Sequence, residues 1–327
     1  MRALVVERLA PDYGGCVLRE LPKPQPGSGE VRVRVRAAAV NFPDLLMTRG
    51  DYQFKPPLPF ICGMELAGDI DALGEGVQGW RVGDAVVGGA KTGAFAQYSV
   101  LSAGQMKPKP TRLTYAQASG CGAAYLTAYV ALVRRAHVQP GEWVLVHGAA
   151  GGVGLACVDL AKLLGCRVIA ASASDEKLEI VRALYAPDAT VNVNGGFREA
   201  VKAITGGRGA DVIYDPVGGD VFDESVRCIA FDGRLLVVGF TSGRIPTISV
   251  NMPLIKGFSV IGVRAGEYGR QFPERGAENR EAVWALAEEG RIHPRVHAEL
   301  PLAQWRSAFD LLANRAVVGK AVIRPDL

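Results

Sequence analysis

The stretch "VLVHGAAGGVGLACVDLAK", residues 144–162, decides the fold class. An apolar, β-branched run ends where the glycines begin, and a helical run follows them. Between the two stands Ala149-x-Gly151-x-x-Gly154, a pattern in which backbone N–H groups and a helix N-terminus converge where a pyrophosphate can bind. Gly151 permits close approach of a ligand and Gly154 permits close helix packing, whereas Ala149 replaces the usual first glycine. A glycine-rich turn of another α/β fold is therefore the alternative.

The residues around this motif alternate between strand and helix patterns. We expect strands at 143–149, 166–172, 190–194, 210–217 and 233–240, with helices at 152–165, 174–184, 197–205 and 219–230. Because β-α-β crossovers are right-handed, such a series predicts an α/β unit with a doubly wound parallel sheet covered on both faces.

The segments before and after this unit differ from it in their pattern of apolar residues, glycines and prolines. The first 110 or so residues show short alternating strands separated by Gly and Pro, at 30–40, 66–73, 84–89 and 93–101, which favours a mostly antiparallel, barrel-like domain. After about residue 265 two helical runs alternate with two strand-like runs. We therefore expect a first domain at 1–122, a nucleotide-binding domain at 123–264, and a segment at 265–327 that returns to the first domain.

Composition and charge limit the class of protein. A length of 327 residues suggests about two domains, and the net charge of +4 is mild. Arg32, Arg34 and Arg36 alternate and are interpreted as the solvent face of a strand, so nucleic acid is not an expected partner. The six cysteines are scattered without a C-x-x-C pair, and no apolar run is long enough for a membrane span. We expect a cytoplasmic protein without a signal peptide or membrane contact.

The end of the second expected strand bears on the choice of nucleotide. An NAD site usually has a carboxylate there, but this chain has Ser172, Ala173 and Ser174, followed by Lys177. Asp175 and Glu176 lie between them and are equally well interpreted as charges at a helix N-terminus. Hydroxyls and a cation suit the 2′-phosphate of NADPH. A solvated helix residue is the alternative for Lys177.

Two further motifs precede the glycine pattern "AAGGVG" at 149–154. They are "NFPD" at 41–44 and "GDY" with "PPLPF" and "GMELAG" over 50–68. In this order they closely resemble the zinc-free quinone oxidoreductase branch of the medium-chain dehydrogenase/reductase superfamily, over essentially the whole chain. The resemblance implies a Rossmann sheet plus a GroES-like, mostly antiparallel β-barrel. It also implies a homodimer formed through the sheet edge near "FSVIGV", residues 258–263.

The resemblance also bears on metal. Zinc dehydrogenases of the superfamily carry Cys at the position of Asn41, His at that of Met64 and Glu at that of Glu65, and only the Glu is kept. The four-cysteine lobe expected after residue 89 is missing as well. We therefore expect no metal, and Glu65 as a structural carboxylate paired with a cation. Without a Lewis acid, the substrate should stabilise its own negative charge, as quinones and α,β-unsaturated carbonyl compounds do.

Two catalytic residues are implied by the resemblance. Asn41 matches the family residue that faces the nicotinamide and donates a hydrogen bond to a substrate oxygen, and a turn-forming role is the alternative. Tyr52 matches a tyrosine thought to supply a proton in related enoyl reductases, with packing or substrate gating as the alternative.

The remaining site residues are expected to bind the cofactor, some because of the resemblance and some because they end parallel strands. Thr127 would lie near the carboxamide or else be a core hydroxyl. Gly239, Phe240 and Thr241 would lie under the nicotinamide ring, in a crevice shaped by Asp215 and Gly218. Arg315 would clamp the 2′-phosphate or else end a helix, and Asn194 stands where relatives have an Asn-Tyr pair, which leaves NADH possible. The expected cofactor-binding residues are Thr127, Ala149, Gly151, Gly152, Val153, Gly154, Ser172, Ala173, Ser174, Lys177, Asn194, Gly239, Phe240, Thr241 and Arg315.

The sequence thus predicts an NADPH-dependent oxidoreductase that transfers hydride to a small electrophilic molecule, a quinone or the C=C bond of an α,β-unsaturated carbonyl compound. Two alternatives remain at this point. One is a reductase of enoyl or acryloyl thioesters, and the other is a non-catalytic NADPH-binding protein of the crystallin or scaffold kind.

Overall fold

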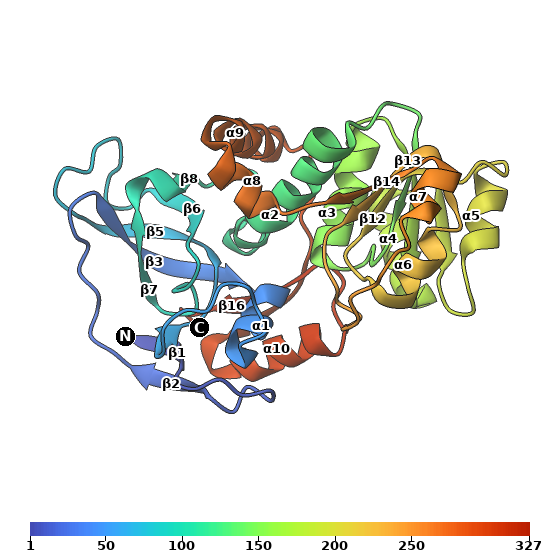
Figure 1. The fold of residues 1–327 in the computed structure, drawn as a ribbon. Helices are drawn as coiled ribbons and strands as arrows, with labels where there is room; N and C mark the ends of the chain where they lie inside the picture. The colour runs from blue at the N-terminus through green and yellow to red at the C-terminus, as the bar shows by residue number, and fades with distance from the viewer. The chain divides into compact units, whose positions relative to one another are not determined.

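A computed structural model describes residues 1–327, and the chain forms two compact units (Figure 1). The first unit contains Met1–Gly122 together with Pro294–Leu327, and the second contains Ala123–His293. Each unit is described by itself.

The expectation that the chain returns to the first unit from residue 265 is wrong for 265–293. Helix α9 (Pro273–Glu289) stays with the second unit, where Arg134 Nε donates to Asn279 Oδ1 at 2.7 Å. The backbone N–H of His293 donates to the buried carboxylate of Asp159 at 2.6 Å. These side-chain contacts hold the segment to the second unit as far as His293. No local sequence pattern predicts them.

The second unit is built on a six-stranded sheet. Its strands are β9 (Trp143–Val146), β10 (Arg167–Ser172), β11 (Ala189–Asn192), β12 (Ala210–Asp215), β13 (Ile229–Val237) and β14 (Ser259–Gly262). The spatial order is β11-β10-β9-β12-β13-β14 and every pair is parallel. Numbered along the chain this is the order 3-2-1-4-5-6 of a Rossmann fold, which confirms the expected doubly wound sheet.

Helices connect and flank these strands. They are α3 (Gly152–Leu163), α4 (Asp175–Tyr185), α5 (Arg198–Ile204), α6 (Gly219–Ser225), α7 (Asn251–Lys256) and α8 (Ala265–Gln271), with α9 last; α2 (Tyr115–Tyr129) and the π-helical η2 (Val130–Ala136) precede the first strand of the sheet. The core lies along the middle of the sheet. Ile169, Leu145, Ile213 and Leu235 stand in register on four adjacent strands and are fully buried. One apolar residue per strand at the same height thus forms a continuous layer against the helices.

The first unit is mostly antiparallel. Its strands are β1 (Arg2–Val6), β2 (Cys16–Glu20), β3 (Glu30–Ala39), β4 (Phe60–Ile61), β5 (Glu65–Leu73), β6 (Ala85–Gly89), β7 (Tyr98–Ser102), β8 (Met106–Pro108), β15 (Val296–Pro301) and β16 (Lys320–Arg324); its helices are α1 (Phe42–Arg49) and α10 (Trp305–Ala313), with short 3₁₀ turns η1 (Ala103–Gln105) and η3 (Leu302–Gln304). One sheet runs β15-β16-β3-β5-β6-β8 with β7 also on β3, and a second runs β2-β1-β4. The pairing of β16 with β3 shows that the last part of the tail rejoins this unit.

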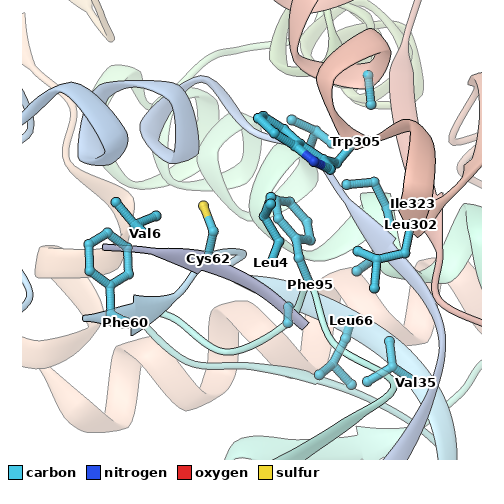
Figure 2. Packing of buried hydrophobic residues seen from close by; sticks show 14 of the residues in the cluster. Leu4, Val6, Val35, Phe60, Cys62, Leu66, Phe95, Leu302, Trp305 and Ile323 are labelled. Carbon is cyan, nitrogen blue, oxygen red and sulfur yellow. The ribbon is translucent and has the colours of Figure 1, made fainter. Parts of the chain in front are cut away.

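The core of the first unit draws on both ends of the chain (Figure 2). Leu4 of β1, Phe95 and Ile323 of β16 are fully buried, and Trp305 of α10 packs on the same cluster. Cys62 is buried in this cluster too, and burial raises the pKa of its thiol well above the usual range. Cys62 is therefore a packing residue, without the thiolate character that a metal ligand needs.

The interpretation of three arginines of β3 as a solvent face is wrong for two of them. Arg34 is exposed, but Arg32 is buried and its Nε lies 2.6 Å from Asp71 Oδ2. Arg36 is half-buried and pairs with Asp69 at 2.7 Å. The neighbouring strand β5 supplies both carboxylates, so cross-strand ion pairs allow the guanidinium groups to leave water.

Among the helices, none combines the length and the apolar character that a bilayer crossing requires.

Candidate functional site

The turn between β9 and α3 presents free backbone donors. Gly151 is the N-cap of α3, and no side chain caps this helix end. The N–H of Gly151 donates to Gly148 O at 2.9 Å, whereas Gly152 and Val153 are half-exposed and, as the first residues of the helix, their N–H groups have no intrahelical acceptor. The helix has twelve residues, and its N-terminal partial charge favours an anion. The turn fits the phosphate groups of a dinucleotide.

Two glycines shape this turn, and one of them was not among the expected residues. Gly148 has φ +56°, a left-handed conformation that favours glycine, whereas Ala149 is buried and its N–H donates to Ala171 O at 3.0 Å. The alanine at the motif's first position is thus tolerated because the turn is made one residue earlier. A Cβ on Gly154 would lie 2.1 Å from Gly148 O, so Gly154 allows the helix to approach the turn itself.

The loops after β12 and β13 are tied to one another. Asp215 Oδ1 accepts from Val217 N at 2.8 Å and from Gly218 N at 2.9 Å. Burial raises the pKa of Asp215, although the two N–H groups oppose that shift. The N–H of Thr241 donates to Pro216 O at 3.1 Å. Gly239, Phe240 and Thr241 follow the end of β13, at the carboxyl edge where parallel sheets bind ligands.

The loop after β10 places two serines before the first carboxylate, Asp175 at the start of α4. Ser174 caps α4 by accepting from Lys177 N at 3.3 Å, and Ser172 Oγ accepts from Ser174 N at 3.4 Å. Asp175, the first carboxylate of the loop, accepts a hydrogen bond from Asn192 Nδ2 at 2.9 Å. Asn194 Nδ2 donates to Ala173 O at 2.8 Å. Asn194 therefore braces the loop from β11 rather than presenting its own amide.

Three other expected site residues have local roles. Thr127 is half-buried and its Oγ1 donates to Ala123 O at 2.7 Å, so the hydroxyl bonds the preceding turn of its helix without lying in the core. Arg315 is exposed with φ +53° directly after α10, where its N–H and that of Ala316 bond Leu312 O and Leu311 O in a Schellman motif. Tyr52 is half-buried against the core of the first unit, and no hydrogen bond within the chain involves its hydroxyl.

A buried polar cluster surrounds Asn41 in the first unit. Asn41 is the N-cap of α1, which agrees with the turn-forming alternative, but its side chain has other partners. Its Nδ2 donates to Glu65 Oε1 at 2.9 Å, and its Oδ1 accepts from Lys320 Nζ. Lys320 Nζ also lies 3.2 Å from Glu65 Oε1. The cation expected beside Glu65 is therefore Lys320, the first residue of β16.

Asp44 completes this cluster. Its Oδ2 accepts from Asn41 N at 2.8 Å, while Oδ1 is buried without a hydrogen-bond partner. Burial raises the pKa of Asp44 to about 7, against the opposing influence of the Asn41 N–H and of the Lys320 charge. The cluster thus combines one ammonium, one paired carboxylate and one carboxyl group whose pKa is raised by burial.

These groups do not form a zinc donor set. Met64 is half-buried against the apolar core, the Asn41 amide nitrogen is a donor, and Glu65 is engaged by an ammonium. No group of three or more His, Cys, Asp or Glu side chains in the chain is arranged to hold a metal ion. The residues present favour a network of hydrogen bonds around Asn41.

Comparison with known proteins identifies two family matches. Residues 27–111 match a family described as "Alcohol dehydrogenase GroES-like domain", and residues 152–280 match one described as "Zinc-binding dehydrogenase". The "Quinone oxidoreductase-like protein 2 homolog" of Nematostella vectensis is 37% identical over 290 residues, covering 88% of this chain and 79% of that protein.

Solved structures match this chain over nearly its whole length. A mycobacterial protein complexed with NADPH has a TM-score of 0.91 and 30% identity, covering 99% of this chain and 100% of that one. The CurK enoyl reductase has a TM-score of 0.89 and 25% identity, covering 99% of both chains.

The fold, the glycine-rich turn before α3 and these matches define a nicotinamide-dependent medium-chain oxidoreductase. The chain belongs to the quinone oxidoreductase branch of the medium-chain dehydrogenase/reductase superfamily.

Two residues of the candidate sites were missed from the sequence. A glycine directly after a buried strand is a usable signal for a left-handed turn and could have identified Gly148. Lys320 carries no such local signal, because it meets Asn41 only through the pairing of β16 with β3, 279 residues apart in the chain.

Proposed function

We propose that this protein is an NADPH-dependent, metal-independent reductase of quinones or of the C=C bond of α,β-unsaturated carbonyl compounds. The observation that carries the proposal is the ammonium of Lys320 at 3.2 Å from Glu65 Oε1. The one carboxylate kept from the zinc ligand set is thereby neutralised, and the adjacent Asn41 amide is a hydrogen-bond donor rather than a metal ligand. A substrate that spreads negative charge over its own conjugated system is the kind such a site can serve.

The preference for NADPH is supported by the loop after β10. Ser172, Ser174 and Lys177 supply hydroxyls and a cation, and Asp175 is bound to Asn192. Hydroxyls and a cation of this kind suit a 2′-phosphate. NADH, which lacks that phosphate, should bind less tightly.

The cofactor, when bound, supplies the hydride that reduces a quinone or adds to the β-carbon of an enone, and one proton completes either reduction. The protein's part is to bind, orient and provide hydrogen bonds. Asn41 would donate an amide N–H to the substrate oxygen on which negative charge develops. Tyr52, whose hydroxyl has no partner in the chain, would hold or deliver the proton.

A steady-state panel of acceptors tests the proposal. Quinones, α,β-unsaturated aldehydes and ketones, and acyl thioesters would each be offered with NADPH and with NADH, following the nicotinamide absorbance. We expect faster turnover with NADPH and with at least one conjugated acceptor class. Tight NADPH binding without oxidation by any acceptor would contradict the enzyme proposal and favour the non-catalytic alternative.

We further propose a homodimer formed through the β14 edge. Strand β14 has one paired side only, and Val260 in it is 38% exposed. Nearby in the chain, Leu254 and Ile255 of α7 are 81% and 71% exposed. Unpaired edges and exposed apolar residues are usually covered.

Light scattering after gel filtration tests this pairing. The mass should be twice 34.7 kDa, and the variant L254D/I255D should shift toward monomer. Leu184→Asp is the matched control, because Leu184 is a 51% exposed residue of α4 in the same unit. A monomeric wild type would refute the dimer.

A further inference from the structure

The cluster around Asn41 connects the two ends of the first unit's sequence. Asn41 precedes α1, Glu65 begins β5, and Lys320 begins β16. The side chains of Lys320 and Glu65 are only 9% and 10% exposed. Charged groups so deeply buried are costly unless they are paired, so their arrangement is specific.

The two charged residues fix the orientation of the Asn41 amide. An ammonium can only donate, so the amide atom that faces Lys320 must be Oδ1. A carboxylate can only accept, so the atom that faces Glu65 must be Nδ2. Exchanging the two amide atoms would leave both contacts repulsive, and the orientation therefore follows from the chemistry of the neighbours.

This orientation leaves one amide hydrogen weakly held. Asn41 Nδ2 carries two N–H groups, of which one donates to Glu65 at 2.9 Å. The other has only Ala39 O at 3.4 Å as a partner within the chain, a long contact. The hydrogen bond that the Lys320 ammonium donates to Oδ1 polarises the amide and strengthens its N–H groups as donors.

We propose that Lys320 is a positioning residue for the reductase reaction, which orients and polarises the Asn41 amide so that its second N–H is directed at the substrate oxygen. The positive charge of Lys320 thereby acts on the substrate oxygen through the Asn41 amide, and it supplies part of the stabilisation that a metal ion would give. The inference rests on the proposed function. It goes beyond that function by assigning a role to a residue that would act through Asn41.

The surroundings of Lys320 hold it in place. Its backbone N–H donates to Arg295 O at 3.1 Å, and the β15–β16 register pairs it with Val296. A Cβ on Gly120 would lie 3.1 Å from Lys320 Cγ, so the lack of a side chain there makes room for the lysine stem. The ammonium therefore has little freedom to leave Asn41.

The kinetic test compares three variants with wild type. Lys320→Met keeps the length of the side chain and removes its charge, and K320M/E65Q removes the unpaired buried carboxylate as well, which should restore folding. Lys109→Met is the control, because Lys109 is a partly buried lysine of the same unit whose Nζ donates to Pro110 O and Leu113 O.

In K320M and in K320M/E65Q we expect kcat with the best acceptor to fall roughly tenfold to a hundredfold, as for other orienting partners. The Kd for NADPH should stay within about twofold, whereas Lys109→Met should match wild type in both.

A purely structural role for Lys320 would give a different result. The neutral double variant would then recover wild-type kcat once it folds, which would overturn the proposal. Wild-type kcat in Lys320→Met would overturn it as well.

A second readout separates this inference from the proposed function. The side-chain ¹⁵N–¹H₂ signals of Asn41, assigned by their loss in Asn41→Asp, should shift in K320M/E65Q and exchange faster with solvent. If wild type reduced none of the acceptors while these signals still shifted, the proposed function would fail and the orienting role would stand. Unchanged Asn41 signals would overturn the role of Lys320 whatever the acceptor panel gave.

Discussion

Gly154 offers a sharp test of the phosphate-binding turn. A Cβ at this position would lie 2.1 Å from Gly148 O, 2.8 Å from Gly148 C and 2.9 Å from Ala149 Cα. All three are backbone atoms that no side-chain rotation can move. In Gly154→Ala, the turn and the start of α3 would have to separate by about 1 Å to restore an ordinary contact.

The expected cost follows from this displacement. Overpacking of a filled interior costs about 1–3 kcal/mol, and three close backbone contacts put Gly154→Ala at the upper end. Alanine in a helix returns at most about 1 kcal/mol relative to glycine. The net loss of about 2 kcal/mol corresponds to a Tm lower by about 4–8 °C for a unit of this size.

Gly151→Ala is the matched control in the same turn. A Cβ there would meet only Gly148 O at 3.3 Å, and Gly151 has φ −77°, which alanine adopts without strain. The Tm should therefore stay within about 1 °C of wild type. The new methyl group would still stand before the helix N-terminus, so NADPH affinity should fall roughly tenfold or more, one tenfold step being about 1.4 kcal/mol.

Thermal denaturation and calorimetric titration with NADPH measure both effects. An unchanged Tm in Gly154→Ala would refute the contact argument. Wild-type NADPH affinity in both variants would show that the turn does not bind the cofactor's phosphates.

Four further outcomes are expected. Lys177→Ala should raise the KM for NADPH roughly tenfold more than that for NADH, whereas equal effects would return Lys177 to a solvated helix position. Tyr52→Phe should slow enone reduction roughly a hundredfold and quinone reduction less, and a uniform change would indicate packing alone. Added zinc or a strong chelator should leave activity unchanged, because Lys320 engages Glu65; loss on chelation would contradict metal independence. Burial lowers the pKa of His147 to about 3, so the unfolded chain binds a proton there below about pH 6.5 and the folded chain does not. Urea denaturation should therefore show stability falling from pH 6.5 to pH 4, and His147→Gln should lose less over that range.

The second unit could be predicted closely from the sequence because its signals are local. Each strand from β9 to β13 is a short apolar run, each helix between them has its own periodicity, and right-handed crossovers leave few ways to connect them. The Ser174 cap and the glycines of the turn are local signals too. The predicted boundary near residue 265 was wrong because it depends on contacts that are not local. Arg134 and Asn279, for example, are far apart in the chain and contact each other in the second unit.

The segment "ICGMELAG", residues 61–68, shows what a local sequence pattern can and cannot predict. The sequence alone indicated that Met64 does not suit zinc and that Glu65 needs a cation. It could not tell that Cys62 lies in the core, nor which cation pairs with Glu65. Both answers depend on which strands meet, and local residue patterns do not encode that.

The amino-acid sequence by itself determined the Rossmann architecture and the glycine-rich turn between β9 and α3, because both depend on residue types at fixed short spacings. It also predicts that an ordinary zinc ligand set is lacking. Only the tertiary structure decided how Asn41 is used. The return of β16 to β3 brings the Lys320 ammonium to the Asn41 amide and to Glu65. Pairing between distant strands is settled by packing of the whole unit, and the chemistry of the buried cluster follows from that packing.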